Sequence, residues 1–304
     1  MDACTLPLPF DPVVLRGLSP TLMDSHHKNN YAGAVKRLNA IRAELAGIAF
    51  GNEPGFRLNG LKREELIATN SMLLHELYFG SLGGDGRTLE PAWSMALDAN
   101  FGSVQRWRDE FTACAKALGG GSGWMLLVFQ PREGTLVNQW AADHTHAVAG
   151  GVPILALDMY EHAYHLDYGA AAARYVDAFM DNIDWAAAYA RYQHAVHAAT
   201  DEFAATVDDV QGNLLLDVRR AGVFKSSDTM IPGARWCDPA DVHRWAGGIP
   251  KDRDVVVYCV YGHEVGRATA LRLRAAGVRA RFLRGGIDGW QAAGRPLDEK
   301  EETS

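Results

Sequence analysis

Residues 158–168 read Asp158-Met159-Tyr160-Glu161-His162-Ala163-Tyr164-His165-Leu166-Asp167-Tyr168. They follow the apolar run 152–157, whose length and composition predict a buried strand. Asp158 therefore ends a strand, and His162 follows four residues later, where a helical turn returns its imidazole to the same side. A carboxylate and an imidazole at this spacing form half of a site for a hard or borderline metal ion.

The other ligands are expected from two helices nearer the N-terminus. Helical composition extends over residues 19–49 and 62–82, and two helices joined in this way predict an antiparallel hairpin. His26 or His27 on the first helix and His75 on the second would complete a set of three imidazoles and one carboxylate. Such a set leaves a position open for a small ligand and suits iron or manganese redox chemistry better than a closed structural zinc.

Residues 158–164 resemble the Asp-x-Trp-Glu-His-Ala-Tyr signature of the iron/manganese superoxide dismutases. The similarity extends over residues 1–197 and includes Gly121-Ser122-Gly123-Trp124, Asn182-Ile183-Asp184-Trp185, His75 followed by Tyr78-Phe79, and the spacing from His26 to Leu38-Asn39. This last spacing favours His26 over His27. The family implies a helical hairpin over 1–88 and an α/β domain over 89–197, with one Fe or Mn ion per subunit between them, iron being weakly preferred.

The activity implied by this resemblance is the disproportionation of superoxide to dioxygen and hydrogen peroxide. The implied metal ligands are His26, His75, Asp158 and His162. Trp124 would form an apolar wall of the pocket. Glu161 would pair with His162 of the partner subunit in a homodimer, with Tyr164 near that interface.

Some positions depart from the family pattern. The usual His-and-Tyr gate on the first helix is replaced by Asn29-Asn30-Tyr31-Ala32-Gly33-Ala34, so Tyr31 is expected to fill part of that role from a different turn. Tyr160 stands where the family has tryptophan. In the family, a glutamine from either of two positions holds the water bound to the ion. Ser71 occupies the first position here. The second falls on residues 142–144, so His144 becomes the expected partner of that water. An alternative is a metal-binding protein with weak dismutase activity.

The pattern changes after about residue 195, where no clear core periodicity remains. Two short continuous apolar runs, 214–218 and 255–259, predict parallel strands buried on both faces. Helical segments and a further strand candidate, 281–283, alternate with them. This alternation predicts a small α/β domain with a parallel sheet over residues 209–304, after a linker over 198–208.

Cys259 ends the second apolar run and precedes a helix. Backbone N–H groups and the helix dipole are expected to lower the pKa of this cysteine and to favour a persulfide. The alternative is a small buried apolar cysteine.

Residues 205–297 are similar to a single-domain rhodanese, in which Cys259 stands at the persulfide position. The segments that carry this resemblance are Leu216-Asp217-Val218-Arg219, Ile231-Pro232-Gly233-Ala234 and Gly285-Gly286-Ile287-Asp288-Gly289-Trp290. It implies a sulfurtransferase with an anionic sulfur donor or acceptor, which His263 and Arg267 could bind. Alternatively, the domain only binds oxyanions or senses redox state. Both families occur in bacterial chromate-resistance gene sets, so a chromate or metal-stress role is a further hypothesis.

Composition and charge indicate which partners and which compartment are expected. A formal net charge of -7 disfavours a nucleic-acid partner. The four cysteines are widely spread without a C-x-x-C motif, which favours reduced thiols and a cytoplasmic protein. The N-terminus lacks the pattern of a signal peptide, and no apolar run approaches the roughly 20 residues of a membrane span.

Overall fold

The computed structural model describes residues 2–300. The chain forms two compact units. The first holds the chain up to Glu90, residues 105–128 and residues 138–189, and the second holds 91–104, 129–137 and the chain from Ala190 onward. Met1 and residues 301–304, at the ends of the predicted domains 1–197 and 209–304, lie outside the described residues.

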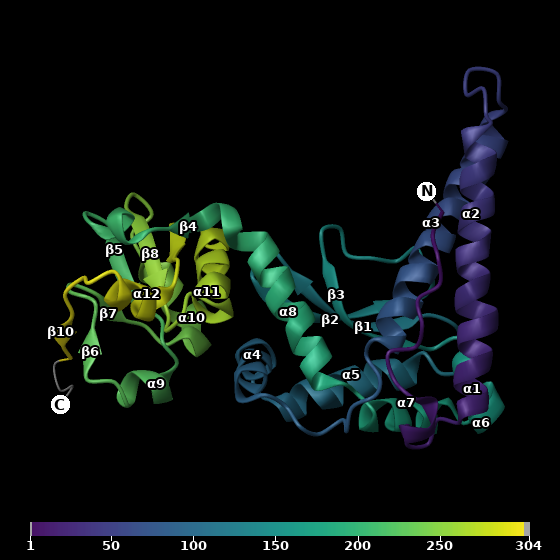
Figure 1. Cartoon of the computed structure of the whole chain (residues 1–304), viewed down its shortest axis with the longest axis horizontal. Helices are drawn as coiled ribbons and strands as arrows, with labels where there is room; N and C mark the ends of the chain where they lie inside the picture. Colours follow the sequence, from purple (N-terminus) through teal and green to yellow (C-terminus); the bar gives the residue numbers. More distant parts are fainter. Residues whose placement is uncertain (1, 301–304) are drawn as a thin grey trace. The chain divides into compact units, whose positions relative to one another are not determined.

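Long helices begin the first unit, after the short turn η1 (Pro12–Val14). The hydroxyl of Ser19 caps α1 (Pro20–Ser25) by accepting a 3.1 Å hydrogen bond from the N–H of Leu22. A π-helical turn, η2 (His26–Tyr31), leads into α2 (Ala32–Ala46), and α3 (Gly55–Phe79) lies beside α2 in Figure 1. The predicted pair of N-terminal helices is therefore present.

The start of α3 differs from the sequence prediction. The second helix was expected to begin at about residue 62, but it begins at Gly55, directly after the extended residue Pro54. Gly60 lies inside the helix with nothing within 4 Å of the place of a Cβ atom. A glycine in an exposed helix costs only about 1 kcal/mol relative to alanine, which the rest of this long helix offsets.

A three-stranded sheet follows, with strand order β2-β1-β3. Its strands are β1 (Trp124–Gln130), β2 (Thr135–Ala141) and β3 (Val152–Asp158). β3 is the strand that the apolar run 152–157 predicted. The last five residues of β3 are buried, so the strand carries the Asp158 side chain into the interior.

Helices cover the rest of the first unit and extend into residues beyond 189. They are α5 (Val104–Ala117), η3 (Glu161–Ala163), α6 (His165–Tyr168), α7 (Ala172–Asp181) and α8 (Trp185–Thr200). Residues 182–184 separate α7 from α8. A second interruption occurs at Gly169, whose φ of +53° favours glycine.

The second unit contains a five-stranded sheet with order β4-β9-β8-β5-β7. Every pair in it is parallel, as predicted. The strands are β4 (Ala204–Ala205), β5 (Leu214–Asp217), β7 (Arg235–Trp236), β8 (Asp254–Tyr258) and β9 (Arg279–Leu283). A small antiparallel pair joins β6 (Thr229–Met230) and β10 (Asp298–Glu299).

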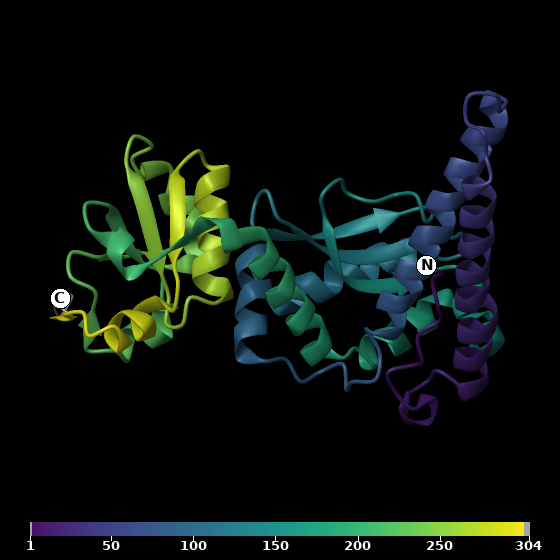
Figure 2. The same ribbon diagram turned by 45° about the horizontal axis from the view of Figure 1, so that its top comes forward.

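The helices of the second unit include α11, which packs against β9 and is visible beside the sheet in Figure 2. The helices are α4 (Pro91–Phe101), α9 (Ala221–Lys225), α10 (Val242–Trp245), α11 (Glu264–Ala275) and α12 (Gly286–Ala292), with short turns η4 (Asp201–Phe203), η5 (Val207–Val210), η6 (Pro239–Asp241) and η7 (Ala246–Gly248). Within residues 2–300, no helix combines the length and apolar character needed to cross a bilayer.

Candidate metal centre

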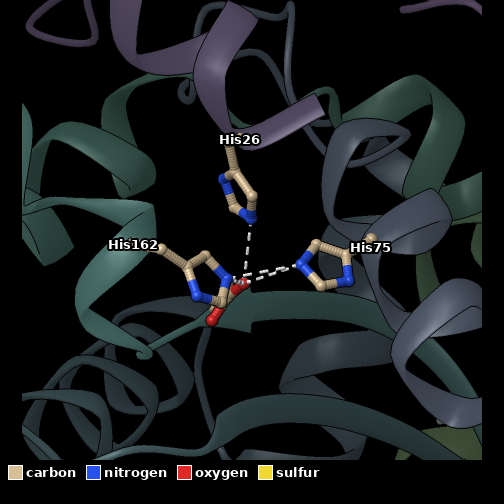
Figure 3. A group of neighbouring side chains, drawn as sticks. His26, His75 and His162 are labelled. Carbon is tan, nitrogen blue, oxygen red and sulfur yellow. Dashed lines mark hydrogen bonds and ion pairs between the residues drawn. The ribbon is translucent and has the colours of Figure 1, made fainter. Parts of the chain in front are cut away.

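Three imidazoles and one carboxylate face a common centre in the first unit. The Nε2 atoms of His26, His162 and His75 lie 3.0, 3.2 and 3.5 Å from Oδ2 of Asp158. One donor atom from each residue lies within 4.8 Å of every other. Figure 3 shows the three imidazoles, which come from η2, α3 and η3, pointing toward one another. The structure thus brings together all four residues predicted as ligands.

His27 lies outside this group. Its Nε2 lies 2.8 Å from the backbone oxygen of Leu6, so its imidazole donates to the N-terminal arm instead. His26 is fully buried. Of the two alternatives left open by the sequence, His26 is the histidine that faces Asp158.

The buried imidazoles of this group are kept neutral. Burial lowers the pKa of His75 to about 3, against the opposing charge of Asp158. Burial likewise lowers the pKa of His26. Burial alone would raise the pKa of Asp158, but its interactions with His162 and His26 outweigh burial and hold that pKa below its ordinary value. The centre therefore presents the neutral imidazoles of His26 and His75 and the ionised carboxylate of Asp158.

The hydrogen bonds of His75 determine its tautomer. Its Nδ1 lies 2.6 Å from the backbone oxygen of Ser71, which can only accept, so Nδ1 carries the proton. Nε2 of His75 is then unprotonated and carries a free lone pair, and this atom lies 3.4 Å from Nε2 of His162. Lone pairs and a carboxylate oxygen directed at one buried point fit a cation. Imidazole with carboxylate is a donor set that suits iron and manganese.

The backbone around Asp158 fixes its carboxylate. The N–H of Tyr160 donates to Oδ1 at 2.9 Å, which leaves Oδ2 for the imidazoles. The hydroxyl of Tyr175 lies 2.8 Å from the backbone oxygen of Asp158. Both contacts restrain the strand end that carries the ligand.

Trp124 and His144 form a second pair beside the centre. The indole Nε1–H of Trp124 donates to Nδ1 of His144 at 2.9 Å, and the ring centroids of Trp124 and His75 are 5.3 Å apart. Indole N–H can only donate, so Nδ1 of His144 is an acceptor and its neutral form carries the proton on Nε2. Burial lowers the pKa of His144, which favours this neutral form.

Tyr31 is positioned by the π-helical turn η2, which has His26 at its other end. Its ring centroid lies 6.4 Å from that of His75. Its hydroxyl donates to Oε1 of Glu76 at 2.9 Å and accepts from the N–H of Leu6 at 2.8 Å. Burial raises the pKa of Tyr31 to about 12, so the phenol is neutral. π-Helical turns are frequent at functional sites.

Residues 90–191 match the family model described as iron/manganese superoxide dismutases, C-terminal domain. A protein from Cupriavidus metallidurans named superoxide dismutase [Fe] is 64% identical over 190 residues, which cover 62% of this chain and 96% of that protein. The chain belongs to the iron/manganese superoxide dismutase family.

Other relatives of this family member carry either metal in their names. A superoxide dismutase [Mn] 2 from Haloferax volcanii is 34% identical over 194 residues, covering 62% of this chain and 95% of that protein. A superoxide dismutase [Fe] from Aquifex pyrophilus is 33% identical over 195 residues, covering 62% and 90%. Beyond this region, residues 199–293 match a rhodanese-like domain, as the sequence predicted.

In the rhodanese-like domain of this dismutase-family chain, Cys259 lies at the junction of β8 and α11. The backbone N–H groups of Gly266, Gly262 and His263 face its sulfur. The predicted lowering of its pKa is wrong, because burial raises the pKa of the thiol by more than these donors lower it. Cys259 is therefore mainly a thiol at neutral pH.

The loop after Cys259 depends on two glycines. Gly262 has φ +70°, and a Cβ atom there would lie 2.7 Å from the backbone N of Gly285 and 2.8 Å from the backbone oxygen of Leu283. At Gly266, a Cβ atom would lie 3.4 Å from the sulfur of Cys259. Small residues at both positions let the backbone approach the sulfur closely.

The polar residues expected near this loop have defined partners. Arg267, an anion-binding candidate, instead donates to the backbone oxygen of Gly262 at 3.0 Å and pairs with Asp201 at 2.7 Å. Asp217, which also binds Arg219, accepts from the hydroxyl of Tyr258 at 2.9 Å, and Tyr258 directly precedes Cys259. Arg267 and Asp217 therefore brace the cysteine loop from two sides.

Glu76 and Tyr175 are contacts of the site that the sequence did not predict. Glu76 accepts from Tyr31, and Tyr175 contacts the backbone of Asp158. Glu76 directly follows the ligand candidate His75, which is a weak signal. Tyr175 lies in a helix with apolar periodicity, so its pattern indicates only core packing.

Proposed function

We propose that this protein is a superoxide dismutase that uses iron or manganese, with iron weakly preferred. Two superoxide anions and two protons give one dioxygen and one hydrogen peroxide. A bound iron or manganese ion supplies the one-electron redox chemistry. The observation that carries the proposal is the buried convergence of three imidazole Nε2 atoms on Oδ2 of Asp158.

His26, His75, Asp158 and His162 would hold the ion in this proposal. The lone pair on Nε2 of His75 is directed to the centre because Nδ1 donates to Ser71. The ionised Asp158 adds one negative charge, which reduces the net charge of the site. Of the four side chains, His162 is the most exposed, at 26%, so substrate is expected to approach from its side.

His144, Trp124 and Tyr31 are proposed to form the surroundings of the reacting oxygen species. With Nδ1 occupied by Trp124, His144 keeps an N–H donor at Nε2 for water or substrate. The indole of Trp124 excludes water from one side of the pocket. Tyr31 shapes another side, and its bonds to Glu76 and Leu6 hold the ring in place.

The test is reconstitution of metal-free full-length protein with iron or with manganese, followed by metal analysis and a superoxide-consumption assay. Iron-loaded protein is expected to turn over superoxide, and Asp158→Ala protein is expected to lose both metal and activity. Full metal loading without superoxide-dependent turnover, for both metals, would support the alternative of a metal-binding protein and remove the dismutase proposal.

We also propose that the protein is a cytoplasmic homodimer, in which Glu161 contacts His162 of the partner subunit. Glu161 is exposed and follows the strand end that carries Asp158. The cysteines at positions 4, 114, 237 and 259 are free, which fits a reducing compartment.

The proposed domain organisation keeps the predicted boundaries, with a dismutase part over 1–197, a linker over 198–208 and a rhodanese-like part over 209–304.

A second activity, persulfide transfer at Cys259, is favoured by the three backbone N–H groups that face its sulfur. The sulfane sulfur of a donor would pass to Cys259 and then to an acceptor. A thiosulfate-to-cyanide transfer assay compares the parent with Cys259→Ser. Equal rates would support the alternative, in which the domain only binds oxyanions or senses redox state.

A chromate-stress or metal-stress role is a further proposal. Unchanged chromate tolerance in a strain that lacks the gene would count against it.

A further inference from the structure

The ring of Tyr160 lies between two imidazoles. Its centroid is 4.8 Å from that of His144, with 11° between the ring planes, and 5.5 Å from that of His162, with 18° between the planes. The ring of His162 in turn lies 5.6 Å from that of His75, at 23°. Near-parallel rings at these separations are in a favourable range for aromatic packing. A continuous stack therefore joins His144 to two of the ligand candidates.

The backbone of Tyr160 is restrained independently of this stack. Tyr160 stands between β3 and η3 with extended dihedral angles, φ -67° and ψ 145°. Its N–H donates to Oδ1 of Asp158. The ring is thus attached to a rigid strand end, and substitutions that keep the backbone N–H keep this bond to Asp158.

His144 needs this support because it lies in the segment between β2 and β3. The hydrogen bond from Trp124 to Nδ1 fixes one point of its imidazole. A single hydrogen bond leaves the ring free to tilt about that point. The face of Tyr160 supplies the second restraint, which defines where Nε2–H is directed.

The hydroxyl of Tyr160 adds a link to the same segment. It interacts with the side chain of Ser122 and with the backbone N–H of His144. An indole at this position, as in the family signature, has no oxygen to accept a hydrogen bond from that N–H. The phenol therefore links Tyr160 to the backbone of the segment that carries His144.

We propose that Tyr160 is a positioning residue that stacks between His162 and His144 and holds Nε2–H of His144 in its working direction. This inference deepens the proposed dismutase function and rests on it for the consequence in turnover. The stack itself is formed by side chains of this chain alone, so it can be tested separately from turnover. It assigns to Tyr160 a role in orientation rather than in electron or proton transfer.

The test compares Tyr160→Phe, which keeps the stacking face, with Tyr160→Leu, which removes it. Tyr160→Met replaces the leucine variant if that protein does not fold, as judged by its thermal unfolding midpoint. The first readout uses metal-free full-length protein labelled with ¹⁵N-tryptophan. The indole N–H resonance of Trp124, assigned among the 8 tryptophans with a Trp124→Phe variant, reports the bond to His144. The second readout is kcat and KM for superoxide after iron reconstitution.

Tyr160→Phe is expected to keep the Trp124 resonance and to retain kcat within about threefold of the parent. Tyr160→Leu is expected to shift or broaden the resonance and to lower kcat by about tenfold or more, with a smaller change in KM. An unchanged Trp124 resonance in folded Tyr160→Leu protein would overturn the inference. Equal loss of kcat in both variants would overturn it as well. A parent protein without superoxide turnover would remove the dismutase proposal, while the metal-free resonance would still decide whether Tyr160 orients His144.

Discussion

Nε2 of His26 and Oδ2 of Asp158 lie 3.0 Å apart, although the two residues are separated by 132 positions in the chain. One belongs to a helical turn near the N-terminus and the other to the end of β3. Their contact forms only when the helices and the sheet have folded together. Metal binding at this centre is therefore expected to stabilise the folded first unit, because the unfolded chain has no such site.

Replacing His26 by alanine is expected to abolish most metal binding, because it removes one of four donors at a buried centre. His27→Ala is the matched control, since its imidazole faces the backbone of Leu6. Metal content per subunit after reconstitution, measured by mass spectrometry, checks this. Loss of metal in the His27 variant with retention in the His26 variant would reverse the ligand assignment.

Glu161→Ala is expected to weaken the proposed homodimer, because it removes a carboxylate at the predicted interface. Sedimentation velocity over a concentration series measures the shift toward monomer. Glu133→Ala, at a site that is also exposed, is the control and should leave association unchanged. A dimer of equal strength in both variants would place the interface elsewhere.

Tyr31→Phe is expected to lower the free energy of unfolding by about 1–2 kcal/mol, because the hydroxyl bonds both Glu76 and the N–H of Leu6. Glu76→Gln keeps an acceptor oxygen for Tyr31 and should cost less. Urea denaturation of the three proteins makes the comparison. An unchanged free energy of unfolding in Tyr31→Phe would show that the hydroxyl contributes little.

Gly262→Ala is expected to destabilise the second unit by about 1–3 kcal/mol, because alanine is strained at φ +70° and its Cβ would clash with two backbone atoms. Gly222→Ala is a suitable control, since a Cβ atom there meets nothing within 4 Å. Denaturant unfolding monitored by fluorescence measures both. A stable Gly262 variant with intact sulfur transfer would argue against the tight loop.

Alkylation of Cys259 by iodoacetamide is expected to accelerate about tenfold per pH unit between pH 7 and pH 9. The thiolate is the reactive form, and burial raises the pKa of this thiol, so its thiolate fraction still increases over the whole interval. Peptide mass spectrometry separates Cys259 from the other three cysteines. A rate that levels off below pH 8 would mean that the thiol pKa is lowered instead.

Much of the fold could be predicted from the sequence. Continuous apolar runs such as 255–259 predicted buried parallel strands, and the spacing of Asp158 and His162 predicted two donors on one side. These features depend on local periodicity, which a sequence displays directly. The start of α3 was missed because Gly60 suggests a break, whereas an exposed helix tolerates a glycine.

The remaining features depend on tertiary surroundings that no local pattern encodes. His26 and His27 are adjacent and chemically identical, so periodicity did not separate them; only the spacing of the family resemblance favoured His26, the residue that faces Asp158. The pKa of Cys259 was predicted in the wrong direction because burial of the thiol, with Gly266 of α11 close to its sulfur, outweighs the backbone donors, and a sequence does not display tertiary burial. The backbone carbonyl of Ser71 fixes the tautomer of His75, and such a backbone contact cannot be read from the residue types in the sequence.

The π-helical turn between His26 and Tyr31 also sets the angular register of the helix that follows. Each residue of an α-helix advances the side chains by about 100°, so deleting one residue from the turn would rotate α2 by roughly that angle relative to His26. Leu38 and Ile41, which are now buried in one cluster with Ala68 of α3, would turn away from that helix. The extra residue of the turn therefore allows two requirements to be met at once. It keeps the apolar face of α2 in the hairpin core while His26 faces the other ligands.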